Sequence, residues 1–578
     1  MSAVASAPKR VDLVLMWHMH QPDYRDHATG EFRLPWVYLH ALKDYTDMAA
    51  HLERHPRMRA VVNFAPVLLD QLEDYADQFA SNRIRDRLLR MLGRDETEPL
   101  AAGDRAFILE RCFEANHERI IRAFPAYRAL LGIFTEVERH GADARTYLSD
   151  QYFHDLVTWY HLGWTGESVR RESEHAARLI AKGAHFTQSE RSALFDVVGA
   201  AIRDVIPRWA RLGQSGRVEL STTPEYHPLA PLLIDFATAR EALPSCVIPA
   251  GRYPGGRERV AAHIDAALAS HARRFDRPAG GVWPAEGGIS EELVQMLAER
   301  RVRWTASGGQ VLRNSVAASR GVQAELPPHR PWHVRRDTSL TCFFRDDFLS
   351  DRIGFEYAKW NGDDAARDLI AAVAGIGAAA TEGETPLVSI ILDGENCWEY
   401  YPYNGHYFLD ALYHGLSDHA TIRPTTYTAW LDERARVDTD PARRPLAAGA
   451  LERLVAGSWV GGNFTTWIGA PEKNHAWELL IAAKAQYDLA RARLPSERLP
   501  RAERQLAACE ASDWFWWLAS ANPAAAVAEL EHLFRMHLSH LYILLGEAPP
   551  AALARPIARG GGTPEAGGTM RRATEHDA

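Results

Sequence analysis

The stretch Gly281-Val282-Trp283-Pro284-Ala285-Glu286-Gly287-Gly288-Ile289-Ser290 has the pattern of a buried strand that breaks into a glycine-rich turn before a helix. Ser290 is a suitable N-cap, and apolar residues follow it at helical spacing. The pattern therefore places Glu286 at the carboxyl end of a strand, where α/β folds carry their chemistry. An alternative use of this carboxylate is to interact with the dipole of the following helix.

A second strand end of the same character follows Pro386–Leu392, which is apolar almost throughout. The chain continues as Asp393-Gly394-Glu395-Asn396-Cys397-Trp398-Glu399-Tyr400-Tyr401. A carboxyl group in such an aromatic setting is expected to have a raised pKa, as a general acid requires. Asp393 followed by Glu395 would also suit a helix N-cap. Two carboxylates in one layer of strand ends favour catalysis over capping.

Two further strands carry polar side chains. Val11–Trp17 ends in His18-Met19-His20-Gln21-Pro22, and strand alternation puts His18 and His20 on one face. Such a pair can ligate a metal, bind the hydroxyls of a ligand, or be purely structural. The strand Gly216–Thr222 contains Glu219, which points toward the barrel interior if its apolar neighbours face the helices.

Composition limits the classes of function. The chain has 578 residues, of which 46% are hydrophobic and 24% charged, so it is long enough for two or more units with ample core. A net charge of −9 gives no indication of a nucleic-acid or anionic-membrane partner. The 17 tryptophans suit a carbohydrate ligand, because indoles stack on the apolar faces of sugar rings, although aromatic cores use them too.

The cysteines and the N-terminus point to an ordinary intracellular setting. Five scattered cysteines with no CxxC pair predict neither a disulfide framework nor a structural zinc site. The apolar run Val11–Trp17 is too short for a signal peptide, and no run is apolar enough to span a membrane. Cytoplasmic location is therefore the default expectation.

Alternating strands and helices over the first two-thirds predict a parallel α/β barrel, residues 1–437, with a helical insertion at about 66–213. Residues 438–547 are expected to form a helical bundle, built on Lys473–Leu494, Glu503–Ala511 and Pro523–Leu545. Aromatic stretches at 459–467 and 513–517 are expected to lean over the barrel mouth. Residues 548–578, rich in Ala, Pro and Gly, are predicted to be a disordered tail.

Several motifs in this order together resemble glycoside hydrolase family 57. They are His18-Met19-His20-Gln21-Pro22, Gly216–Leu220 with Tyr226-His227-Pro228, Trp283-Pro284-Ala285-Glu286, Asp393-Gly394-Glu395-Asn396 with Trp398–Tyr401, and Trp459–Trp467. The resemblance implies an incomplete seven-stranded (β/α) barrel, whose active site is completed by the C-terminal helices. It also implies a retaining mechanism on α-linked glucans.

The resemblance also implies site residues and a branch of the family. Glu286 corresponds to the nucleophile and Asp393 to the general acid/base, with the carboxyl groups about 5–5.5 Å apart. Neighbouring charges are expected to keep Glu286 ionised, and the charge of Glu286 is expected to raise the pKa of Asp393. The expected substrate-binding residues are His18, His20, Glu219, His227, Trp283, Trp398, Trp459 and Trp467. The fourth motif is most similar to the α-amylase and amylopullulanase branch, acting on α-1,4 and, as a further option, α-1,6 links.

Other functions stay open at this point. A 4-α-glucanotransferase or branching-type transglycosylase would use the same scaffold, although Gln21-Pro22 differs from the leucine-proline pair usual in branching enzymes. A metal-dependent hydrolase would bind zinc through His18 and His20. A non-catalytic glucan-binding protein would keep the pocket alone. The preferred hypothesis needs no metal and no cofactor, and its partner is an α-glucan or maltooligosaccharide.

Overall fold

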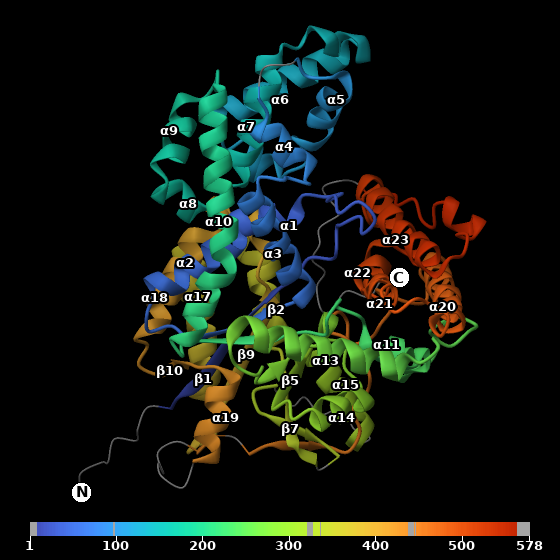
Figure 1. The fold of residues 1–578 in the computed structure, drawn as a ribbon. Coiled ribbons are helices and arrows are strands. Elements are labelled where there is room, and N and C mark those ends of the chain that lie inside the picture. Colours follow the sequence, from blue (N-terminus) through green and yellow to red (C-terminus); the bar gives the residue numbers. More distant parts are fainter. Residues whose placement is uncertain are drawn as a thin grey trace, which may run out of the picture.

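A curved parallel sheet forms the centre of the protein, seen in a computed structural model that describes residues 9–95, 99–320, 328–335, 337–436, 444–445 and 447–562 (Figure 1). Seven parallel strands follow one another across the sheet in this part of the chain. In spatial order they are β9 (Leu387–Asp393), β1 (Val11–Met19), β2 (Ala60–Phe64), β3 (Val218–Thr222), β4 (Gly281–Val282), β5 (Trp304–Ser307) and β7 (Asp337–Phe344).

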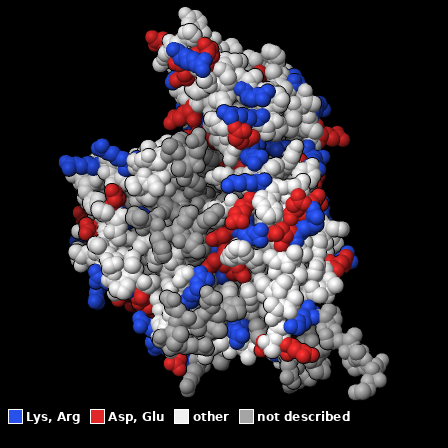
Figure 2. Space-filling model, turned by 180° about the vertical axis from the view of Figure 1, so that it is seen from behind, with Lys and Arg blue, Asp and Glu red and all other residues white. Residues whose placement is uncertain are grey.

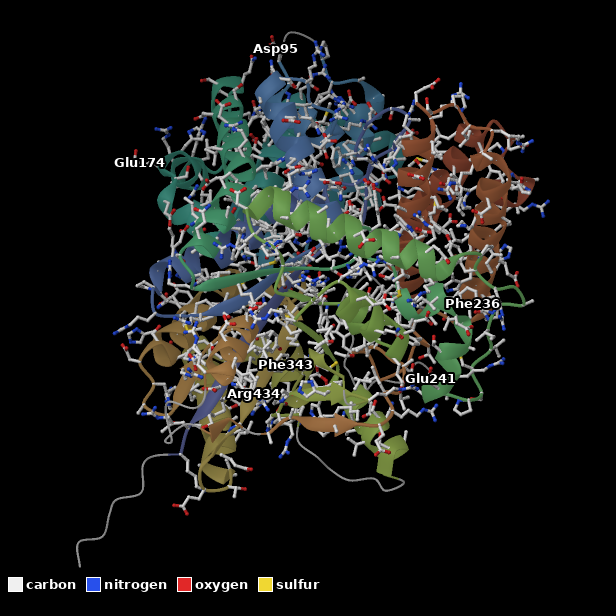
Figure 3. The ribbon with its side chains drawn as sticks, turned by 60° about the horizontal axis from the view of Figure 1, so that its bottom comes forward. Asp95, Glu174, Phe236, Glu241, Phe343 and Arg434 are labelled. Carbon is white, nitrogen blue, oxygen red and sulfur yellow. The ribbon has the colours of Figure 1, made fainter. Side chains whose placement is uncertain are left out.

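Alternation of side chains curls this sheet around an apolar interior. In β1, Val14 and Met16 belong to a small inner cluster, whereas the residues between them pack outward on the helices. The inner cluster also contains Phe343, which is labelled in Figure 3 and stacks on Tyr427 at 4.3 Å between ring centroids. The strands are therefore apolar on both faces, as parallel strands covered by helices must be.

The sheet comes close to closing between its two outer strands, β7 and β9. The Asp346 N–H, directly after β7, donates to Ser389 O at 2.8 Å, and Arg345 Nε donates to Ile391 O at 2.8 Å. A backbone contact and one side chain thus bridge the gap that an eighth strand would fill. The predicted incomplete (β/α)7 barrel is confirmed.

Short strands extend the sheet beyond the barrel, and helices cover it. The added strands are β10 (Ile422–Pro424) beside β1, antiparallel β6 (Trp332–Val334) beside β7, and β12 (Gly449–Leu451) beside β6. The covering helices are α1 (Trp36–His40), α2 (Thr46–Arg54), α11 (Ala230–Ile234), α12 (Ala239–Ala242), α13 (Gly256–Phe275), α14 (Glu291–Glu299), α15 (Gly309–Arg320), α16 (Asp347–Asp351), α17 (Gly362–Ala379), α18 (His406–Ser417) and α19 (Tyr427–Ala435).

A helical insertion between β2 and β3 rises above the barrel in Figure 1. It comprises α3 (Pro66–Ser81), α4 (Arg87–Gly93), α5 (Ala102–Arg111), α6 (Pro125–Arg139), α7 (Asp150–Trp164), α8 (Glu167–Glu172), α9 (Glu174–Lys182) and α10 (Gln188–Gln214). The long α10 starts at a capping box formed by Thr187 and Glu190. Its far end leads directly into β3, so the insertion is anchored at both ends to neighbouring strands.

The C-terminal helices lie to the right of the barrel and above α11 in the view of Figure 1. They are α20 (Pro471–Arg491), α21 (Leu499–Cys509), α22 (Asp513–Trp517) and α23 (Ala524–Leu545). Phe236, labelled in Figure 3, lies 5.0 Å from the Trp477 ring of α20 in an edge-to-face contact. Isolated β-bridges join Pro228 to Ala511 and Ile289 to Gly457. The helical region is therefore fixed to the loops that follow β3 and β4.

The predicted disordered tail is wrong for residues 548–562. Leu553 is buried, and its carbonyl accepts from Arg535 Nη1 at 2.9 Å. Glu531 accepts from the Ile557 N–H at 3.2 Å, and a bridge pairs Pro523 with Gly562. Contacts with α23 therefore order a segment whose composition alone indicated disorder. Residues 563–578 lie outside the described residues. The same holds for residues 437 and 438, between which the domain boundary was predicted.

Charges of both signs are found on the surface. Among the described residues, no helix is both long and apolar enough to cross a membrane. On the face shown in Figure 2, basic and acidic side chains are interspersed.

Candidate active site

The layer of side chains at the carboxyl ends of the strands is polar, unlike the apolar layers below it. In register, His18 of β1 lies opposite Asn63 of β2 and Asp393 of β9, and Asn63 lies opposite Ser221 of β3. These positions continue the inward-facing alternation of the inner cluster. Arg345 enters the same layer after β7. The barrel interior is therefore mostly apolar up to this layer. We call the layer of His18, Asn63, Ser221 and Asp393 the polar floor.

Glu286 stands on the turn after β4 in a strained conformation. Its φ is 58° and that of Gly287 is 57°, so a non-glycine residue adopts left-handed backbone here. His227, after β3, has the same φ of 58°. Such conformations cost about 1–3 kcal/mol each and cluster at functional sites. The predicted N-cap of α14 is confirmed, since Ser290 accepts from the Leu293 N–H, and Glu286 makes no capping contact there.

Two residues from the C-terminal region complete the site: Asp513, which begins the predicted aromatic stretch 513–517, and Ser512, which the sequence analysis did not single out. Ser512 and Asp513 lie at the start of α22, just before its aromatic run. The Ser512 N–H donates to His227 O at 2.9 Å, and Ser512 Oγ lies 3.0 Å from Glu286 Oε1. A serine and an aspartate before an unusually aromatic helix were a visible signal, but their proximity to Glu286 depends on tertiary packing.

A hydrogen-bonded chain connects Glu286 to the barrel floor. Ser512 Oγ lies 3.0 Å from His227 Nδ1, His227 Nε2 lies 3.0 Å from His18 Nε2, and His18 Nδ1 meets the Asn63 side chain at 2.7 Å. Burial lowers the pKa of His18 to about 3 and that of His227 well below its usual value, so both rings are neutral. When Ser512 donates to an ionised Glu286, it has to accept from His227 Nδ1, which fixes the tautomer of the neutral His227 ring.

His20 and Asp513 form a second pair beside this chain. His20 Nε2 lies 2.9 Å from Asp513 Oδ1, and the side chains are 10% and 12% exposed. The side chain of Glu286 is 14% exposed, whereas that of His227 is 2% exposed. Among the described residues His20 Nδ1 has no hydrogen-bond partner. His20, Asp513 and Glu286 are therefore the more accessible side chains of the site, and His18 and His227 are buried behind them.

The two candidate catalytic carboxyl groups both have raised pKa values. Burial, followed by the charges of Asp513 and Asp393, raises the pKa of Glu286 to about 8. Burial raises the pKa of Asp393 to about 6, opposed by the Asn396 hydrogen bond and by the charges of His20 and Arg345. The expectation that neighbouring charges keep Glu286 ionised was wrong for the free site, because its charged neighbours are acidic.

Asp393 is not a helix cap. Its Oδ2 accepts from Asn396 Nδ2 at 2.7 Å, and the short helix that follows, Asn396–Tyr400, has Glu395 as its N-cap position with no side-chain cap bond. Glu395 is buried instead beneath His20, accepting from Gln21 Nε2 at 2.8 Å. The capping alternative for this stretch is therefore not what the structure uses.

A buried ion-pair cluster holds the segment that carries Ser512 and Asp513. Glu510 is fully buried and accepts from Arg259 Nη2 at 2.8 Å, from His263 Nε2 at 2.7 Å and from the Tyr253 hydroxyl. Burial alone would favour the neutral acid, but Arg259 and His263 lower the pKa of Glu510 to about 2. Helix α13 thereby fixes the chain two residues before Ser512.

The geometry allows a test of the metal alternative. Ligand atoms of His20, His227 and Asp513 all lie within 4.8 Å of one another. The His20 and His227 rings, however, stack face to face with centroids 3.7 Å apart and planes 22° apart. Stacked imidazoles direct their in-plane lone pairs side by side, not to one point. Both nitrogens of His227 also meet hydrogen-bond partners, so these residues fit a metal poorly.

Glu219 does not join the site. It faces inward but lies one layer below Ser221, about 7 Å along β3. Its carboxylate accepts from Trp304 Nε1 at 2.7 Å and from the Thr428 N–H at 2.8 Å. The inward orientation was predicted correctly. These contacts, however, join β3, β5 and α19 one layer below the polar floor, so Glu219 is separated from the candidate site.

Most of the predicted stacking tryptophans are core residues. Trp283, Trp398 and Trp467 are each at most 1% exposed. Trp398 Nε1 donates to Gly394 O at 2.9 Å, and its ring packs on Trp17. Trp459 is the exception. Its side chain is only partly buried, and its ring centroid lies 5.5 Å from the Arg345 guanidinium. Its backbone N–H donates to the Glu286 backbone carbonyl at 3.2 Å. The bulk of the aromatic stretches therefore serves packing.

Comparison with known proteins places this arrangement in a family. The structure is similar to those of a branching enzyme from the hyperthermophilic archaeon Pyrococcus horikoshii (16% identity, TM-score 0.58, 94% of this chain and 93% of that one) and a branching enzyme from Thermococcus kodakaraensis (15%, 0.57, 92% and 90%). It is also similar to the α-amylase AmyC of Thermotoga maritima (14%, 0.54, 93% and 93%). At these identities the likeness shows the fold. A search of curated proteins gave no match.

The family model named "Glycosyl hydrolase family 57" matches residues 14–439, a span that includes both Glu286 and Asp393. The match covers most of the chain, and the structural relatives described as GH57 enzymes share its fold from end to end. This protein therefore belongs to glycosyl hydrolase family 57 and is an enzyme of the glycoside hydrolase type.

Proposed function

We propose that this protein is a retaining glycoside hydrolase that acts on α-1,4-linked glucans, with Glu286 as nucleophile and Asp393 as general acid/base. The observation that carries the proposal is the pair of buried carboxyl groups with raised pKa values, each on a strand-end loop of the barrel. Such a pair holds one proton near neutral pH, which is what a double displacement requires. The α-glucan specificity rests on family membership and on the described activities of the structural relatives.

In the proposed reaction, Asp393 donates its proton to the glycosidic oxygen as the bond to the anomeric carbon breaks. Glu286 attacks that carbon, and a covalent glycosyl-enzyme forms. Asp393, now ionised, takes a proton from water, whose oxygen attacks the anomeric carbon and releases Glu286. Ser512 donates to Glu286 when it is ionised, and His20 and Asp513 bind sugar hydroxyls beside it.

The pKa values of Glu286 and Asp393 are both raised, so the two carboxyl groups share one proton near neutral pH. The reactive arrangement has this proton on Asp393 and leaves Glu286 ionised. Positive charge that develops at the anomeric carbon favours an ionised Glu286, so the reacting sugar itself promotes this arrangement.

Product analysis tests the proposal. The protein would be incubated with maltoheptaose and, separately, pullulan, beside Glu286→Ala and Asp393→Ala, with and without chelator. Shorter maltooligosaccharides from wild type alone, unaffected by chelator, are expected. Products both longer and shorter than the substrate would show that the protein is a transglycosylase and not a hydrolase. Loss of activity with chelator would restore the metal alternative, and unchanged substrate throughout would refute glucan turnover.

A further inference from the structure

Exposed aromatic side chains gather on one part of the barrel rim. Among the described residues, the strongly exposed aromatics are Phe348 (67%), Trp360 (43%), Tyr403 (57%), Tyr407 (50%) and Tyr147 (90%). All but Tyr147 come from two segments, one following β7 and the other following β9. Since chains leave the carboxyl ends of these parallel strands toward the side that carries Glu286, the two segments start at the same end of the barrel as the proposed active site.

The side chain of Arg352 contacts both rings of the first segment, Phe348 and Trp360. The Arg352 guanidinium carbon lies 5.5 Å from the Phe348 ring centroid and 5.7 Å from that of Trp360. Arg352 in turn is paired with Asp368 at 2.6 Å. The guanidinium covers only part of each ring, since Phe348 is 67% and Trp360 43% exposed, and the exposed part is available to a ligand.

Of the other two rings, Tyr403 stands on a strained turn and Tyr407 lies in the first turn of α18, which follows it. Tyr403 and Asn404 both have φ of 53°, and the Asn404 side chain is fixed by Lys43 at 3.1 Å and Asp47 at 2.9 Å, both buried. The Tyr403 and Tyr407 rings lie 5.3 Å apart at 89°. Buried polar groups thus stabilise a backbone conformation whose visible result is an exposed aromatic pair.

The two halves meet to form one surface. A Cβ placed on Gly362, two residues after Trp360, would lie 2.8 Å from Phe408 N, so the segments pack directly on each other. Arg171 of α8 donates to the Tyr407 hydroxyl at 3.2 Å and closes the far end. We call Phe348, Trp360, Tyr403 and Tyr407 the aromatic strip.

We propose that the aromatic strip is a second carbohydrate-binding site, which holds an α-glucan chain outside the proposed active site by stacking sugar rings on its aromatic faces. Flat rings with polar edges suit pyranose faces and their hydroxyls, and the strip adjoins the loops of Asp393 and Arg345. The choice of ligand rests on the proposed function. The strip is predicted to increase affinity for long chains and to leave the turnover of short oligosaccharides unchanged.

The test compares Phe348→Ala/Trp360→Ala and Tyr403→Ala/Tyr407→Ala with Tyr147→Ala, which removes an aromatic of the insertion that is 90% exposed. Binding to glycogen is measured by affinity electrophoresis in a Glu286→Gln background, so that the probe is not consumed. Turnover of maltoheptaose is measured with Glu286 intact. Each strip variant is expected to bind glycogen about tenfold more weakly, with maltoheptaose turnover within about twofold of the parent and Tyr147→Ala unchanged in both.

The outcomes separate this inference from the proposed function. Normal glycogen binding by both strip variants overturns the inference. If maltoheptaose is still turned over, the proposed function is unaffected by that result. Strip-dependent glycogen binding without any maltoheptaose turnover supports the strip and refutes the function. A changed oligomeric state in the strip variants with normal glycogen binding overturns the inference in favour of a protein interface.

Discussion

Two buried glutamates in this protein have opposite electrostatic surroundings. Glu510, between α21 and α22, is surrounded by Arg259, His263 and Tyr253, and its pKa is lowered to about 2. Glu286 is surrounded by Asp513 and Asp393, with Ser512 as hydrogen-bond partner, and its pKa is raised to about 8. Burial opposes ionisation of both, so the difference comes from the neighbours. Glu510 is a structural anion, whereas Glu286 keeps a proton that chemistry can remove.

The largest expected effect is on turnover. Glu286→Gln and Asp393→Asn are each expected to reduce kcat on maltoheptaose by roughly 10³-fold or more, because each removes one of the two groups that act on the glycosidic bond. The matched control is Glu114→Gln in the insertion, whose pKa is likewise raised to about 7 by burial. A comparable loss in the control would mean that buried carboxyl groups matter here for folding alone.

The next effect is on stability, and the two glutamates should differ in sign. Glu510→Gln leaves Arg259 without its buried anion and is expected to lower the free energy of unfolding by about 3–5 kcal/mol. Because its folded-state pKa is depressed, the Glu510 contribution is present above about pH 4.5 and is lost as pH falls toward 2. Glu497→Gln, on the surface, is the control.

Glu286→Gln is expected to raise the free energy of unfolding at pH 8 by roughly 1–3 kcal/mol. A carboxyl group whose folded pKa is raised contributes stability below about pH 4.5, and this contribution is lost as pH rises through 8. Urea denaturation followed by tryptophan fluorescence at pH 5 and pH 8 measures both glutamates. A lower free energy of unfolding in Glu286→Gln at pH 8 would contradict the opposite effects expected for Glu286 and Glu510.

Ser512 links the two regions, since Glu510 fixes its position and Glu286 receives its hydrogen bond. Ser512→Ala is expected to reduce kcat/KM by about 10–100-fold and to move the pH–rate profile to higher pH, because a donor to ionised Glu286 is lost. Ser512→Thr keeps the hydroxyl and should recover most of the activity. An unshifted profile in Ser512→Ala would show that the serine only packs.

The smallest effect is the form of the pH profile itself. The pair Glu286 and Asp393 holds one proton between about pH 6 and about pH 8, so kcat/KM should be bell-shaped with limbs near these values. The acid limb reports a second proton on the pair, and the alkaline limb reports loss of the last one. A profile that stays flat from pH 5 to pH 9 would exclude this pair as the catalytic one.

The sequence predicted the barrel well because its signals are local. Apolar strands that end abruptly in His18, Glu286 and Asp393 mark the catalytic edge without any knowledge of packing. Asn63 carries the same signal, a polar residue at the end of an apolar strand, and was overlooked. Disorder was predicted wrongly for residues 548–562 because their order depends on contacts with α23, which composition does not reveal.

Other errors arose because periodicity shows on which face a residue lies but not its depth. Glu219 points inward as expected, yet it lies below the site. Trp283 and Trp398 adjoin the two carboxylates in sequence, but burial in the core prevents them from stacking on a sugar. Ser512 and Asp513 reach Glu286 from more than two hundred residues away, through contacts between α13 and the C-terminal helices that only the folded chain provides.

The account is tested most directly by trapping the glycosyl-enzyme. Asp393→Asn would be mixed with an α-maltotriosyl fluoride, whose fluoride leaves without a general acid, while water attack is slowed by the missing base. Mass spectrometry of the digested protein is predicted to find a maltotriosyl ester on the peptide that carries Glu286, absent in Asp393→Asn/Glu286→Gln. A label on Asp513 or Glu395, or release of the β-anomer with no label, would contradict the assignment of Glu286 as nucleophile.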